Sequence, residues 1–136
     1  MAKVDINTKM ITLLGDPLKQ SFAAQMQNCG YEAAGLNMIY FYTEVNNEHL
    51  VVNGIRYMNF AGFAVTKPNK VKVLEYLDEL DPLCEKMGAS NTVVKTPEGK
   101  LVGYNTDGIG FIRSMERDGN VKIDENTYFC IGSGGA

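Results

Sequence analysis

The chain has 136 residues, of which 45% are hydrophobic and 21% charged, and its formal net charge is −3. This length predicts one main domain that buries its own core. Lysines and arginines do not cluster, which argues against nucleic acid as a partner. No apolar run approaches the ~18 residues that cross a bilayer, and the start of the chain lacks the apolar segment of a signal peptide, so we expect a cytoplasmic protein without a membrane partner.

Apolar runs alternate with helix-like patterns along the chain. The first half predicts, in order, a strand at 10–15, a helix at 23–34 closed by Gly35, a strand at 38–45, a helix from a cap at Asn46 or Asn47 to about residue 58, and a strand at 60–65. The second half predicts a helix from Pro68 through residue 77, a helix from Pro82 to near Gly88, a β-hairpin of 89–95 and 101–104 with Gly99 in its turn, a helix at 107–118 and a strand at 127–131. The alternation predicts an α/β fold with three αβα layers around a mixed, mostly parallel sheet.

The cysteines and the histidine point away from metal and nucleophile chemistry. Cys29, Cys84 and Cys130 lie far apart and in odd number, which favours neither a disulfide framework nor a zinc site. Each has apolar neighbours, so we interpret each as a small core residue. His49 is the only histidine and lies in a polar stretch typical of a helix start, so we expect it on the surface.

The last predicted strand runs into the glycine-rich segment Gly132-Ser133-Gly134-Gly135-Ala136. A strand followed by Gly-x-Gly-Gly-Ala is typical of the opening of a Rossmann unit, because glycines let the backbone approach a pyrophosphate. The alternative is a flexible glycine tail. We therefore predict a substrate-binding catalytic domain at 1–125 and, at 126–136, the first strand and glycine loop of a truncated NAD(P)-binding domain. Gly132, Gly134, Gly135 and Ala136 are its cofactor-binding candidates, and we expect no NAD(P)H oxidation by this chain alone.

Four polar segments follow predicted strands or open predicted helices, where α/β sheets bind ligands. They supply Ser21, Lys70, Asn91 and Asp107. The first turn of the predicted helix would lower the pKa of Lys70, which suits a general acid or base. The alternatives are a helix cap for Ser21 and Asp107, a turn residue for Asn91 and a solvated surface lysine for Lys70. As a set, they could hold a hydroxylated carboxylic acid and move one proton.

Together these motifs resemble the shikimate/quinate dehydrogenase family, and in particular its N-terminal substrate-binding domain. The resemblance covers essentially the whole chain and is closer to the branch that accepts both quinate and shikimate. It rests on five motifs in order: GDPLKQS at 15–21, VTKPNK at 65–70, GASNT at 88–92, GYNTD at 103–107 and GSGGA at 132–136.

The resemblance implies an oxidoreductase that uses NADP or NAD to reduce 3-dehydroshikimate reversibly to shikimate, in the chorismate route to the aromatic amino acids. It implies a shikimate- or quinate-like acid as the small-molecule substrate, and it leaves room for a homodimer. It makes Lys70 and Asp107 the catalytic pair, and it implies substrate contacts from Ser21, Tyr40, Thr66 and Asn91.

Three positions depart from the family pattern. Ala23 stands where the family usually has a second serine, Gln20 replaces a histidine, and Ala64 replaces an asparagine. One charge-assisted hydrogen bond is worth roughly 1.5–3 kcal/mol, so Ala23 would weaken the binding of the usual acid. A diverged paralogue that binds a polyol carboxylic acid without catalysis is therefore the alternative hypothesis.

Overall fold

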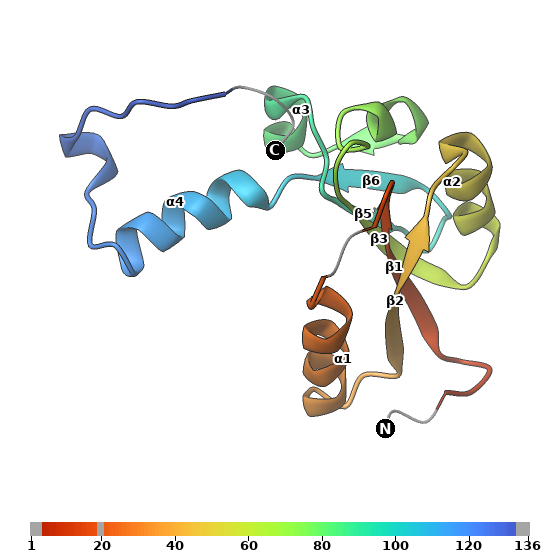
Figure 1. The fold of residues 1–136 in the computed structure, drawn as a ribbon. Coiled ribbons are helices and arrows are strands. Elements are labelled where there is room, and N and C mark those ends of the chain that lie inside the picture. Colours follow the sequence, from red (N-terminus) through yellow and green to blue (C-terminus); the bar gives the residue numbers. More distant parts are fainter. Residues whose placement is uncertain (1–3, 19–20, 133–136) are drawn as a thin grey trace.

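A six-stranded sheet organises the computed structural model, which describes residues 4–18 and 21–132 (Figure 1). The strands are β1 (Lys9–Gly15), β2 (Met38–Glu44), β3 (Phe60–Val65), β4 (Glu79–Leu80), β5 (Thr92–Lys95) and β6 (Leu101–Tyr104). The helices are α1 (Ala23–Ala33), α2 (Glu48–Tyr57), α3 (Pro82–Met87) and α4 (Asp107–Arg117), with 3₁₀ turns η1 (Lys72–Tyr76) and η2 (Ile123–Glu125). The predicted α/β class is confirmed.

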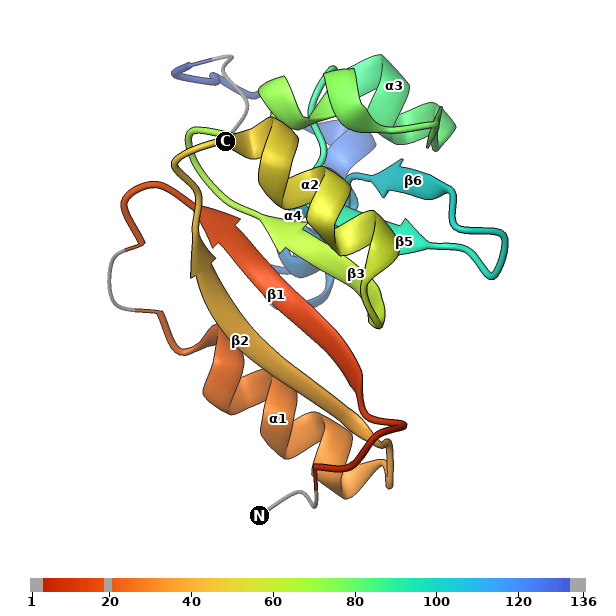
Figure 2. The ribbon, with the colours of Figure 1, turned by 90° about the vertical axis from the view of Figure 1, so that its right-hand side faces the viewer.

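The sheet is mixed and has the order β2-β1-β3-β5-β6-β4. Strand β1 pairs in parallel with β2 and β3, and β4 pairs in parallel with β6. The predicted hairpin of β5 and β6 adds the antiparallel pairs, with Gly99 at a positive φ of 87° in its turn. Helices α1 and α2 lie on opposite faces of the sheet (Figure 1 and Figure 2), which gives the three layers that the alternation predicts.

The core lies between the sheet and the layer that α2 and η1 form on one of its faces. Asn47 begins α2, because its side chain accepts a hydrogen bond from the backbone amide of Leu50. The opposite helix, α1, buries no residue but is tied to β2, since the Asn28 side chain bonds both backbone groups of Tyr40 at 2.8 Å. The core residues are apolar and come from the strands, from α2 and η1, and from the position after β2: Leu14, Val45, Val52, Ile55, Phe63, Val65, Val73, Val93 and Leu101.

The helix predicted from Pro68 through residue 77 is wrong in its first part. The segment after Pro68 is a turn, and only η1 is helical, as a 3₁₀ turn. An α-helix would need the Lys70 carbonyl to accept from Leu74, but that carbonyl accepts from the Ser90 amide at 2.8 Å, and Leu74 donates to Val71. Lys70 therefore lies outside any helical first turn, and the predicted effect of a helix dipole on Lys70 is wrong.

The strand predicted at 127–131 is not formed. Among the described residues no strand pairs with it, and Phe129 and Ile131 are 91% and 90% exposed. A strand needs a partner ladder, which an apolar run does not reveal. The cysteine prediction holds for the buried Cys84 and is wrong for Cys29 and Cys130, which are exposed because α1 and the segment after η2 bury little.

None of the described helices is long and apolar enough to span a membrane. His49 is exposed on α2, as predicted, and its ring contacts Tyr76 edge-on at 6.1 Å between centroids.

Candidate functional site

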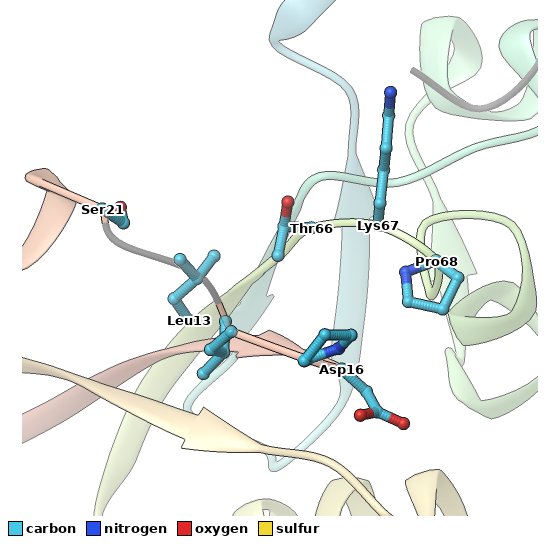
Figure 3. Close-up of a pocket in the computed structure, with 8 residues that line it drawn as sticks. Leu13, Asp16, Ser21, Thr66, Lys67 and Pro68 are labelled. Carbon is cyan, nitrogen blue, oxygen red and sulfur yellow. The ribbon is translucent and has the colours of Figure 1, made fainter.

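The loops after β1 and β3 form a pocket (Figure 3). These strands are parallel neighbours, with Leu14 opposite Val65, so their carboxyl ends release both loops at the same edge of the sheet. Two predicted substrate-binding residues, Ser21 and Thr66, come together there. The full lining is Leu13, Asp16, Pro17, Leu18, Ser21, Thr66, Lys67 and Pro68.

The predicted catalytic pair also meets in space. Lys70 Nζ donates to Asp107 Oδ2 at 2.6 Å, and Asn91 Nδ2 donates to Asp107 Oδ1 at 2.7 Å. Each carboxylate oxygen is therefore held by one partner. The Lys70 side chain is 15% exposed and that of Asp107 44%, so the pair is half-shielded from water yet open to a small molecule. The arrangement can hold a proton at Lys70 Nζ beside a fixed carboxylate.

Backbone hydrogen bonds hold Asn91, which bonds to Asp107, at the ends of two strands. The Asn91 carbonyl accepts from Val65, and the Asn91 amide donates to the Tyr104 carbonyl, so Asn91 bridges the ends of β3 and β6. The Asn91 side chain also accepts from the Thr106 amide at 3.0 Å. Asn91 therefore has a structural role as well as its contact with Asp107.

Asp107 was a candidate helix cap, but it is the first residue of α4, after the N-cap Thr106, and the first amides bond to Asn105 instead. The buried Asn105 accepts from the amides of Asp107 and Gly108 at 3.1 and 3.4 Å and donates to the Ala89 carbonyl at 2.9 Å. Because Asn105 satisfies the first amides of α4, the carboxylate of Asp107 is left for Lys70 and Asn91. Sequence reasoning missed Asn105, although its place two residues before Asp107 was the available signal.

Ser21 lies just before α1 and in the pocket wall. Its Oγ accepts from the Ala23 amide at 3.2 Å, as a cap does, and it also lines the pocket. The Ser21 segment is held by Tyr42, whose hydroxyl donates to the Ser21 carbonyl at 2.6 Å and accepts from the Ala24 amide at 3.0 Å.

Tyr40 does not reach the pocket lining. It is 6% exposed in the middle of β2, and burial, followed by the neighbouring Tyr31 and Tyr42, raises its pKa to about 12. Tyr42, which was not among the predicted residues, lies two residues closer to the carboxyl end of the same strand. Side chains two apart in a strand share a face, so only the position along β2 separates the two tyrosines.

The described residues do not fit a dinucleotide by themselves. Gly132 has a φ of +101°, and a Cβ built there would meet no atom within 4 Å, so nothing cradles it. Gly134, Gly135 and Ala136 lie outside the described residues. The described part of the chain also holds no group of three or more His, Cys, Asp or Glu that could bind a metal.

Residues 13–93 match the model of a family described as the shikimate dehydrogenase substrate binding domain. The chain belongs to this family. It is 42% identical over 130 residues to the shikimate dehydrogenase (NADP(+)) of Lysinibacillus sphaericus, covering 94% of this chain and 47% of that protein. It is 43% identical over 135 residues to the enzyme of the same name from Methanococcus maripaludis, covering 98% and 48%. The chain therefore spans about half the length of the curated relatives it matches.

Two solved structures with this fold are named for different substrates. The shikimate 5-dehydrogenase of Listeria monocytogenes, in complex with shikimate and NAD, matches with a TM-score of 0.80 and 37% identity over 88% of this chain and 42% of that one. The 5-ketofructose reductase of a Gluconobacter strain matches with a TM-score of 0.76 and 33% identity over 82% and 41%. The family resemblance and the fold class are thus both confirmed.

Proposed function

We propose that this chain is the substrate-binding half of an NADP-dependent shikimate dehydrogenase that interconverts 3-dehydroshikimate and shikimate. The contact of Lys70 Nζ with Asp107 Oδ2 at 2.6 Å carries the proposal, because it joins a carboxylate to a cation in the turn that also supplies Thr66, Lys67 and Pro68 to the pocket. Relatives named for this activity, at 42–43% identity, support it. Quinate remains a second candidate acid.

In such an enzyme a nicotinamide cofactor, bound mainly outside this chain, would supply the hydride chemistry. The residues of this chain bind, orient and exchange a proton. Lys70 Nζ donates a proton to the carbonyl oxygen in reduction and takes it back in oxidation. Asp107, held on its other oxygen by Asn91, orients the substrate hydroxyl and keeps Lys70 aligned. Ser21 and Thr66 offer hydroxyls to the substrate from the pocket wall.

The same proposal covers the remaining sequence-based expectations. It includes a domain boundary between residues 125 and 126, a cytoplasmic location and a homodimer. It also includes a role in cofactor binding for Gly132, Gly134, Gly135 and Ala136. The substrate role of Tyr40 has the weakest support, because Tyr40 does not line the pocket.

A second candidate is binding without catalysis. Ala23, at the start of α1, offers no hydroxyl where the family usually has one, and the relative named for 5-ketofructose suggests that this fold can take other polyols. In this reading the chain holds a hydroxylated ligand and transfers nothing.

Turnover and binding together separate the two candidates. In the complete protein that carries this chain, shikimate-dependent NADP⁺ reduction is compared between wild type, Lys70→Met and Lys86→Met, an exposed lysine on α3. We expect Lys70→Met to lose about 10²–10⁴-fold in kcat with an unchanged unfolding curve, and Lys86→Met to match wild type. Normal turnover in Lys70→Met would overturn the proposal. Wild-type protein that binds shikimate calorimetrically without any turnover would favour the second candidate.

A further inference from the structure

One cation on the pocket wall has no role in the proton chemistry. Lys67 follows Thr66 in the turn after β3 and lines the same pocket. In Figure 3 the side chains of Lys67 and Thr66 extend in the same direction, whereas the carboxylate of Asp16 points the opposite way. Lys67 is exposed, and it makes no hydrogen bond or ion pair with any other described residue.

The charge of Lys67 is therefore not compensated locally. Lys70, three residues further along, is neutralised by Asp107 at 2.6 Å. Glu44, near the other loop, accepts from the Leu18 amide at 3.2 Å. The chain as a whole carries −3, so its overall field repels an anion, and an anionic substrate needs a local attractive group.

We propose that Lys67 determines specificity, giving this pocket a preference for a substrate that bears a carboxylate over an uncharged polyol of the same shape. Lys67 and Thr66 line the same pocket and extend in the same direction, so a carboxylate at the pocket mouth can take a charge-assisted hydrogen bond from the ammonium and a neutral one from the hydroxyl. This inference rests on the proposed function, since it assumes that the pocket holds the ring of a hydroxylated acid.

Paired ligands test the charge directly. Calorimetry on this chain compares shikimate with its uncharged methyl ester, at low salt, for wild type, Lys67→Met, Lys67→Arg and Lys9→Met. Lys9 lies at the start of β1, at the other end of the strand from the pocket loop, and its removal changes the net charge equally. The ratio of the two Kd values within each variant cancels any steric cost of the ester.

We expect wild type to prefer the acid, and Lys67→Met to lose about tenfold of that preference while its affinity for the ester is unchanged. Lys67→Arg and Lys9→Met should keep the wild-type ratio. An equal ratio in wild type and Lys67→Met, or a wild type that does not discriminate, would overturn the role of Lys67 and leave the proposed function standing. Failure of wild type to bind either ligand, with a normal unfolding curve, would count against the proposed function itself.

Discussion

Lys70 and Asp107 are separated by 37 positions in the sequence, yet Lys70 Nζ lies 2.6 Å from Asp107 Oδ2. Lys70 belongs to the turn after β3, and Asp107 begins α4. If the two act as one unit, removing either should cost nearly as much turnover as removing both. We expect Lys70→Met, Asp107→Asn and the double variant to fall to a similar kcat in the complete protein. Additive losses would show independent roles. Lys122→Met, which breaks an exposed pair with Glu125, is the control.

Asn105 should matter for stability more than its polar side chain suggests. Asn105→Ala removes the side-chain acceptor of the first α4 amides and leaves the Ala89 carbonyl with only the Cys84 thiol as a donor, at 3.3 Å. We expect the free energy of unfolding in urea to fall by about 2 kcal/mol. Asn126→Ala removes an exposed hydrogen bond to Lys122 and should change it by less than about 0.5 kcal/mol. Equal effects from the two variants would contradict the capping role.

Tyr42 should act on ligand binding through the Ser21 segment. Tyr42→Phe loses the hydrogen bonds to the Ser21 carbonyl and from the Ala24 amide but keeps the ring. We expect shikimate affinity, measured by calorimetry, to weaken by about three- to tenfold, equivalent to one or two neutral hydrogen bonds. Tyr57→Phe, at a site 86% exposed, is the matched control and should bind as wild type does. Wild-type affinity in Tyr42→Phe would show that the segment is held without it.

Two glycine substitutions should change the free energy of unfolding in opposite directions. A Cβ at Gly62 in β3 would lie 2.2 Å from the Val93 carbonyl oxygen of the neighbouring strand, so Gly62→Ala must push β3 and β5 apart. We expect a loss of about 1–3 kcal/mol in the free energy of unfolding. Gly110→Ala in α4 meets no atom within 4 Å and should add about 0.5–1 kcal/mol, because alanine loses less backbone entropy in a helix. Chemical denaturation of both variants measures the two changes. A change of the same sign in both would contradict the prediction.

The Asp78 carboxylate should contribute to the free energy of unfolding, and this contribution should be lost in acid. Its pKa is held below the ordinary 3.8, first by the Arg56 side chain and then by the Leu101 amide. Because the folded-state pKa is lowered, the contribution is complete above about pH 3.8 and is lost as pH falls through the folded-state pKa. We expect Asp78→Asn to cost about 1 kcal/mol near neutral pH, a value reduced for partial exposure. The cost should shrink on acidification.

Unfolding curves of wild type and Asp78→Asn at several pH values measure this difference. Glu116→Gln, which removes an exposed carboxylate on α4, is the control and should show a small difference that does not shrink with acid. A constant gap between wild type and Asp78→Asn down to the acid limit would rule out the linkage.

The sequence by itself determined most elements and named the candidate reactive groups. Periodicity placed β1, β2 and β3 to within one residue and the hairpin strands to within three, and Asn47 and Gly99 were recognised because caps and turns act within a few residues. The motifs also named Lys70, Asp107 and Asn91, which the structure brings together.

Only the tertiary structure decided what depends on contacts distant in sequence. The carbonyl of Lys70 bonds to Ser90, so the expected helix after Pro68 does not form, and the 127–131 segment finds no partner strand among the described residues. Asp107 meets Lys70 across 37 positions of sequence, while Tyr42 rather than Tyr40 reaches Ser21. The physical reason is common to all four. A backbone or side-chain group bonds to the partner that the strand order brings within hydrogen-bonding distance. The local sequence pattern does not reveal that order.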